Sequence, residues 1–136
     1  MIFKGLEISV SGMDAQRVRF EITASNIANV NSTDAGDGQP YRRKVPVFKS
    51  VLEEEMGKPI YKVKVVKIEE DKSPFKLKYD PTHPDADENG YVKLPNVDPL
   101  REMVDMMSAI RTYEANLTAF NTNKEMISKA IEILRV

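Results

Sequence analysis

Heptad repeats at the two ends constrain the fold of this chain more than any other feature. In the first repeat, apolar residues recur at alternating steps of three and four from Phe3 to Ile27, and Arg17 is the polar exception. The second repeat runs in the same way from Met103 to Leu134, with Lys124 as its polar exception. Side chains at this spacing lie on one narrow stripe of an α-helix, the surface that contacts another helix in a coiled coil. The spacing therefore predicts two long helices that pack against partner helices.

We expect the apolar members of both repeats to form the contacts between helices during assembly. The N-terminal stripe consists of Phe3, Leu6, Val10, Met13, Phe20 and Ile27, and the C-terminal stripe consists of Met103, Met106, Ile110, Tyr113, Leu117, Phe120, Ile127, Ile131 and Leu134. At 1.5 Å per residue, the first helix is ~40 Å long and the second is ~54 Å long. Because a compact domain of this size has a radius of gyration of only ~14 Å, the molecule must be elongated.

The sequence also predicts where the helices begin and end. Asp98 is a favourable N-cap, and Pro99 suits the first position of the second helix. The first helix fades from Asn26 onward, where asparagine tolerates the left-handed conformation of a helix terminus. Gly5 and Gly12 weaken the first helix by up to ~1 kcal/mol each. They are either a tolerated loss, or a sign of close helix approach or of a helix that orders only upon assembly.

Short β-branched and aromatic runs replace the helical period in the middle of the chain. Strands are expected over residues 44–49, 60–68, 75–79 and 91–94, as a small antiparallel element. In the second run, Ile60, Lys62 and Lys64 alternate with Tyr61, Val63 and Val65, which predicts one solvated face. The fold class is thus α+β, with an N-terminal core helix in 1–31, a loop and β-rich segment in 32–95, and a C-terminal core helix in 96–136.

Composition excludes several classes of function. The net charge of −1 provides no basic face for nucleic acid. There is no cysteine, hence no disulfide framework or thiolate metal site. No apolar run is long enough for membrane insertion. The first residues lack the basic and apolar regions of a signal peptide, so we expect any export to use a route without one.

No motif supports catalysis, a cofactor or a metal. Asp85 to Gly90 matches the first half of an EF-hand loop, but Lys93 and Asn96 stand where the second half needs its ligands, including the bidentate glutamate. The one histidine, His83, lies in a proline-flanked loop and has no second imidazole or thiolate beside it. The lysines of the β-rich segment form either a solvated edge or a surface that contacts neighbouring subunits. We therefore expect no enzyme activity.

Several motifs in order resemble those of the flagellar basal-body rod proteins. Asn26-Ile27-Ala28-Asn29-Val30-Asn31-Ser32 resembles the N-I/L-A-N-x-x-S/T signature of flagellar axial proteins, and we expect Asn26, Asn29, Asn31 and Ser32 to shape the turn out of the first helix. The further matches, which are closest to proximal rod proteins, are Asp37-Gly38-Gln39-Pro40-Tyr41-Arg42, Gly90-Tyr91-Val92, Pro95-Asn96-Val97-Asp98 and Glu102-Met103-Val104. The resemblance covers essentially the whole chain.

The resemblance implies a structural subunit of the proximal rod, assembled by helix packing into a tubular, periplasm-spanning structure of the flagellar basal body. Its partners would be copies of itself, other rod subunits, the adapter protein at the rod base and the flagellar export apparatus, which exports such subunits without a cleaved signal peptide. The alternative is a self-contained coiled-coil adaptor whose β segment binds a partner protein. The adaptor would be well folded in solution, whereas a rod subunit would have poorly ordered ends before assembly.

Overall fold

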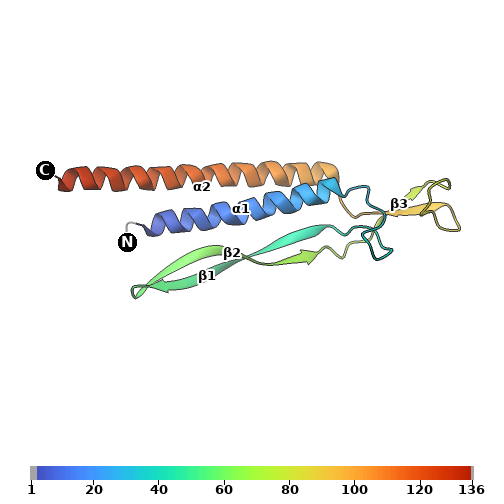
Figure 1. The fold of residues 1–136 in the computed structure, drawn as a ribbon, viewed down its shortest axis with the longest axis horizontal. Helices are drawn as coiled ribbons and strands as arrows, with labels where there is room; N and C mark the ends of the chain where they lie inside the picture. The colour runs from blue at the N-terminus through green and yellow to red at the C-terminus, as the bar shows by residue number, and fades with distance from the viewer. Residues whose placement is uncertain (1–2, 136) are drawn as a thin grey trace.

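The computed structural model describes residues 3–135 and shows an elongated α+β molecule (Figure 1). Two long helices, α1 (Lys4–Ala28) and α2 (Pro99–Leu134), lie side by side and run in opposite directions. Between them in sequence come the strands β1 (Lys44–Glu55), β2 (Lys58–Glu70), β3 (Lys76–Tyr79) and β4 (Tyr91–Leu94). The predicted fold class is confirmed. Met1, Ile2 and Val136, at the outer ends of the expected helical segments, lie outside the described residues.

The second helix begins where its capping residues predict. The Asp98 carboxylate accepts a hydrogen bond from the backbone N–H of Leu100 at 3.1 Å, and Pro99 occupies the first turn. This cap satisfies one of the backbone donors that a helix leaves unpaired at its start. The far end of α2 extends past the start of α1 (Figure 1). None of the described helices has a stretch long and apolar enough to span a bilayer.

Strands β1 and β2 form a long antiparallel hairpin, which packs along α1 on a different side from α2 (Figure 1). The register shifts once, because Val47 pairs with Lys67 and Phe48 with Val65, which leaves Val66 as a bulge. The tip contains Met56 and Gly57, with φ angles of 52° and 74°. The left-handed conformation is unusual for a residue with a side chain such as Met56, whereas glycine adopts it readily.

The hairpin turns the face that carries Ile60 and Lys62 toward α1. Ile60 is 2% exposed, and the Lys62 ammonium lies 3.4 Å from the Glu7 carboxylate of α1, so the lysine-bearing face packs toward the helix. Tyr61, by contrast, is 63% exposed. The alternation left open which face is solvated: Lys62 lies toward α1, whereas the side chains of Lys64 and Lys67 on the same face are 55% and 59% exposed. Alternation separates two faces but does not say which one a helix covers, and here ion pairs with acidic residues favour the lysine face.

Strands β3 and β4 form a second, short hairpin at the end of the molecule where α1 finishes and α2 begins (Figure 1). Tyr79 and Tyr91 pack edge to face, with ring centroids 5.3 Å apart. Val92 and Val97 are 1% and 0% exposed, and they form a small apolar core at this end. The most completely buried part of the molecule therefore lies at the junction between the helices and the β segment.

Candidate assembly site

Close contact between α1 and α2 depends on glycine. A Cβ atom added to Gly12 would lie 2.7 Å from the Asn116 Oδ1, and one added to Gly5 would lie 2.9 Å from the amide of Asn123. These distances are too short for real Cβ contacts. The two contacts lie seven residues apart on each helix, so the same contact repeats after two helical turns. Of the two interpretations of these glycines, the structure supports close helix approach.

The N-terminal stripe lies beside this contact and not within it. Leu6, Met13 and Ile27 are half-buried, whereas Phe3, Val10 and Phe20 are exposed. The residues of α1 that are buried are mostly small or polar. This small and polar stripe was not predicted from the sequence, although the seven-residue spacing of the two glycines indicates it.

The C-terminal stripe is divided in the same way. Met106, Phe120 and Ile127 are half-buried, while six members are exposed: Met103, Ile110, Tyr113, Leu117, Ile131 and Leu134. The buried residues of α2 are Glu102 and Ala109, which together with Asn116 and Asn123 follow a separate seven-residue repeat. Much of the predicted apolar stripe is thus left uncovered in the single chain.

Members of the two stripes meet in one groove on the flank of the helix pair, which we call the flank groove. It has a volume of about 490 Å³ and is lined by Gln16, Arg17, Phe20, Ala109, Ile110, Tyr113, Glu114 and Leu117. Phe20, Ile110 and Leu117 are 38%, 42% and 41% exposed. Arg17 pairs with Asp14 and Glu21 of its own helix, both at 2.8 Å, and this arrangement leaves the groove mostly apolar. A groove of this kind fits a third apolar helix or strand.

Near the C-terminal end of α1, Asn26 connects three segments in what we call the polar junction. Its side chain is fully buried and makes four hydrogen bonds. The Oδ1 atom accepts from the Tyr41 hydroxyl at 2.8 Å and from the Lys44 N–H at 3.0 Å. The Nδ2 group donates to the Lys44 carbonyl at 2.9 Å and to the Glu102 carboxylate at 3.1 Å. A buried asparagine with every donor and acceptor paired holds its neighbours in one geometry.

An ion pair completes the polar junction. The Glu102 side chain is 0% exposed and accepts a hydrogen bond from the Arg43 Nε. The guanidinium also lies 3.4 Å from Asp71 and 3.5 Å from Asp105. Burial opposes the charged form of Arg43, but the hydrogen bond to Glu102 and the neighbouring carboxylates raise the pKa of the guanidinium above its ordinary value. In the sequence, Glu102 stood out as part of the Glu102-Met103-Val104 motif, and nothing indicated a role for Arg43.

The other signature residues act locally. The Asn29 Nδ2 donates to the Ser25 carbonyl at 2.8 Å, and the Ser32 hydroxyl donates to the Asn29 Oδ1 at 3.1 Å. Asn31 is exposed. Asn29 has a φ of −102°, so the expected left-handed asparagine does not occur at this cap. The helix end is instead held by side-chain hydrogen bonds, which removes the need for a left-handed residue.

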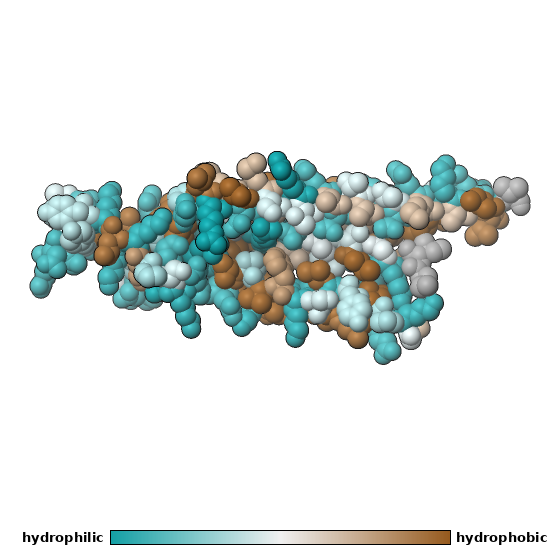
Figure 2. Space-filling view, turned by 180° about the vertical axis from the view of Figure 1, so that it is seen from behind, coloured by the Kyte–Doolittle hydropathy of each residue, from teal (hydrophilic) through white to brown (hydrophobic). Residues whose placement is uncertain are grey.

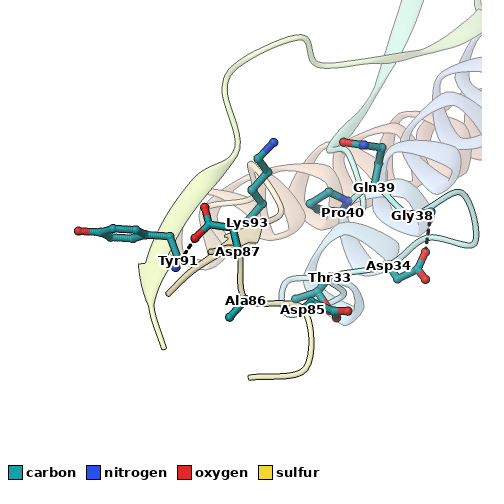
Figure 3. A pocket seen from close by; sticks show the side chains of 10 residues that line it. All are labelled: Thr33, Asp34, Gly38, Gln39, Pro40, Asp85, Ala86, Asp87, Tyr91 and Lys93. Atoms are coloured by element: carbon teal, nitrogen blue, oxygen red, sulfur yellow. Dashed lines mark hydrogen bonds between the residues drawn. The ribbon is translucent and has the colours of Figure 1, made fainter. Parts of the chain in front are cut away.

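The partial EF-hand segment lines a polar cavity between two loops (Figure 3). Its volume is about 300 Å³. The Asp87 carboxylate accepts the backbone N–H groups of Asn89 and Tyr91, each at 2.9 Å, and Asp34 accepts the N–H of Gly38 at 3.0 Å. These carboxylates thus bind their own loop backbones, as in ordinary Asx turns. His83 acts similarly, since its Nδ1 accepts the Asp85 N–H at 3.0 Å.

Comparison with known proteins identifies the family. Residues 6–34 match the family described as "Flagella basal body rod protein", and residues 88–133 match "Flagellar basal body rod FlgEFG protein C-terminal". The chain is 49% identical to the flagellar basal-body rod protein FlgC of Bacillus subtilis, over 96% of this chain and 97% of the relative. It is 51% identical to FlgC of Aquifex aeolicus, over 96% of each chain. For FlgC of Salmonella typhimurium the identity is 45%, over 93% of each chain. The chain therefore belongs to the family of the flagellar basal-body rod protein FlgC.

Proposed function

We propose that this chain is a structural subunit of the proximal rod in the flagellar basal body, and that it assembles by helix packing through its two apolar stripes. The observation that carries the proposal is the flank groove, where Phe20 of one stripe meets Ile110 and Leu117 of the other. These apolar side chains are exposed in the single chain, at a site that fits another helix. The occupant in the assembled rod is a helix of a neighbouring subunit.

The end of α2 supports the same proposal. Because Gly5 lies opposite Asn123, the last turns of α2 run beyond the start of α1 and have no helix of their own chain beside them (Figure 1). Ile131, Ile133 and Leu134 are 53%, 74% and 85% exposed in this overhang. An isolated helical end with apolar side chains gains stability mainly from packing. A neighbouring subunit that covers the overhang would provide that packing.

Membership of the rod-protein family supports a proposal for the remaining partners. We propose contacts with other rod subunits and with the adapter protein at the rod base, after export through the flagellar export apparatus without cleavage of a signal peptide. The N-terminal stripe begins at Phe3, so a cleavage within α1 would remove part of the assembly surface. No step of this proposal involves catalysis, a cofactor or a metal. The alternative adaptor would have the flank groove occupied in a finite complex outside the flagellum.

A single charged substitution in the flank groove tests the proposal. Leu117→Asp would place an unpaired carboxylate in an apolar contact between subunits, which is strongly unfavourable. Leu117 is 41% exposed in the single chain, so the purified variant should keep its helical circular dichroism. We expect cells that carry it as their only copy to make the protein and to lose swimming motility.

The matched control is Ala119→Asp, which adds the same charge to an exposed position on a different face of α2. This variant should support normal swimming. Full motility of the Leu117→Asp strain would contradict the assembly role of the flank groove. A stable, monodisperse complex of the wild-type chain with a protein outside the flagellum, and absence of the chain from purified basal bodies, would favour the adaptor instead.

A further inference from the structure

The outer face of the β1–β2 hairpin is apolar and uncovered. The strand register places Phe48, Ser50 and Leu52 of β1 on one face, with Val65, Val63 and Tyr61 as their partners on β2, and Ile68 follows beyond the bulge. Leu52, Tyr61 and Ile68 are 54%, 63% and 53% exposed, and Phe48 and Val63 are each 39% exposed. Figure 2 shows apolar side chains gathered along the hairpin layer below the helices. A two-stranded sheet with one apolar face in water lacks a partner layer.

Charge is distributed unequally between the two faces of the hairpin. Lys49, Lys62, Lys64 and Lys67 belong to the inner face by register, and Lys62 reaches Glu7 of α1 and Glu53 of β1 at 3.4 and 2.7 Å. Between its two ends the outer face carries no charged side chain; Glu54 stands at the end near the hairpin tip, and Glu70 stands at the other end opposite Lys44. Within residues 3–135 neither of these glutamates forms an ion pair. The outer face is thus an apolar strip with charged side chains at both ends, and its end near the hairpin tip carries the carboxylate of Glu54.

A complementary surface lies on α2, facing away from α1. Leu100, Val104 and Met107 are 72%, 59% and 55% exposed, and their spacing puts them on one side of the helix. Val104 and Met107 line a shallow groove of about 310 Å³ together with Ser108, Arg111 and Thr112. Arg111 is the charged residue of that groove. We call the side formed by Leu100, Val104, Met107 and Arg111 the back of α2.

We propose that the outer face of the hairpin in one copy of this chain packs on the back of α2 in the next copy; this inference rests on the proposed function. The two surfaces match in length, since the strip from Pro46 to Leu52 is ~20 Å long and the back of α2 from Leu100 to Arg111 is ~17 Å long. Their charges are complementary at one end, because the Arg111 guanidinium can meet the Glu54 carboxylate, which has no lysine opposite it in the register.

The positions of these two surfaces in the molecule favour a second copy of the chain as the binding partner of the outer face. The hairpin and the back of α2 form opposite outer layers with α1 between them (Figure 1). A contact between unlike surfaces of identical chains repeats from copy to copy, and it builds open assemblies when the rotation does not close a ring. A contact between two hairpins would instead pair the same face twice and end growth at a dimer.

The size of the contact agrees with a role inside a larger assembly. Five large side chains with about half of their surface exposed offer on the order of 400 Å², which is half of the ~800 Å² that each partner contributes to a standard stable interface. Two free subunits should therefore not dimerise through this surface alone. The contact becomes effective where other interfaces already hold the subunits together, as in a rod.

Disulfide trapping tests the inference directly, because the chain contains no cysteine. Ser50→Cys on the outer face is a mild change at an exposed position, and it is combined with Met107→Cys on the back of α2. Basal bodies are purified from motile cells that carry the double variant as their only copy, and are then oxidised. A repeating contact between unlike surfaces should give a ladder of dimers, trimers and longer multimers. Val104→Cys replaces Met107→Cys in a second strain, so that a one-turn error in register or a failed variant does not decide the result.

The matched control is Lys49→Cys with Met107→Cys, since Lys49 is adjacent to Ser50 but lies on the inner face; it should give no ladder. Four results would overturn the inference. Two concern the double variants in assembled basal bodies: no cross-link for either pair, or adducts only with a different protein. The other two are dimers from Ser50→Cys alone, and a ladder that forms only when Leu117→Cys is combined with Ser50→Cys in place of the variant on the back of α2. If the wild-type chain is absent from basal bodies, the proposed function fails; if it is present and no ladder forms, only this inference fails.

Discussion

Glu102→Ala should destabilise the subunit more than any change at its surface. Glu102 is 0% exposed and pairs with Arg43, whose side chain is 11% exposed. Removing one partner of a buried ion pair costs about 3 to 5 kcal/mol. The lower end applies here, because Arg43 retains Asp71 at 3.4 Å and Asp105 at 3.5 Å. The Asn26 amide also loses one of its two acceptors, at a cost of about 1 kcal/mol.

We therefore expect Glu102→Ala to lower the free energy of unfolding by about 3 to 4 kcal/mol, most of it from the ion pair. For a chain of this size the melting temperature should fall by about 10 °C. Urea and thermal unfolding of the purified chain, followed by circular dichroism, measure both quantities. The control Glu125→Ala removes an exposed glutamate from the same helix and should change stability by less than about 0.5 kcal/mol.

A paired substitution separates the ion pair from the space that it fills. Replacing Arg43 by Met and Glu102 by Leu together removes both charges and retains side-chain volume, a change that is often neutral in buried pairs. We expect this double variant to be more stable than Glu102→Ala alone. A loss of less than about 1 kcal/mol in Glu102→Ala would contradict the reasoning, because that is the cost of one ordinary hydrogen bond and not of a buried charge left unpaired.

Three further predictions concern the helix contact, the first residues and pH. Gly12→Leu should lower the free energy of unfolding by about 1 to 3 kcal/mol through overpacking, because its Cβ would lie 2.7 Å from the Asn116 Oδ1. Adding Asn116→Ala should recover part of that loss, as measured by urea unfolding. An unchanged urea midpoint for Gly12→Leu would contradict close packing of the helices. Intact-mass measurement of the assembled protein should show an uncleaved start, and a mature chain that begins beyond Leu6 would contradict the proposed export without cleavage. The hydrogen bond from Lys62, together with a second lysine, lowers the pKa of the Glu53 carboxyl from 4.5 to about 2. The contribution of Glu53 to hairpin stability is therefore present above pH 4.5 and is lost as the pH falls toward 2. An NMR titration of the Glu53 carboxyl with an ordinary midpoint would contradict this prediction.

The helices were predictable because their determinants are local. A three-and-four spacing, the Asp98 cap and Pro99 all act within a few residues of one another, and they correctly predict an α2 that begins at Pro99 and ends at Leu134. The β-strands were predictable as elements for the same reason. Their observed ends extend beyond the predicted runs, to Glu55 in β1 and Glu70 in β2, because pairing across the hairpin stabilises charged residues that have little strand preference.

Two features could not be predicted, because they depend on contacts distant in the sequence. The polar junction unites Asn26, Arg43 and Glu102, and only the folded chain shows that these polar residues share one buried site. The orientation of the hairpin depends on which face meets α1, and Lys62 reaches Glu7 only in that arrangement. A hydrophobic alternation would otherwise favour the reverse. Both features require the spatial register of separate segments, which no local pattern contains.

The most direct test of helix-packing assembly is an electron cryo-microscopy map of the basal body from cells that express this chain. If the subunit assembles by helix packing, its density should occupy the proximal rod, and Phe20, Ile110 and Leu117 should lie within about 4 Å of side chains from a helix of a neighbouring subunit. A map in which the subunit is present in an intact rod, but these three side chains face solvent, would contradict assembly through the flank groove.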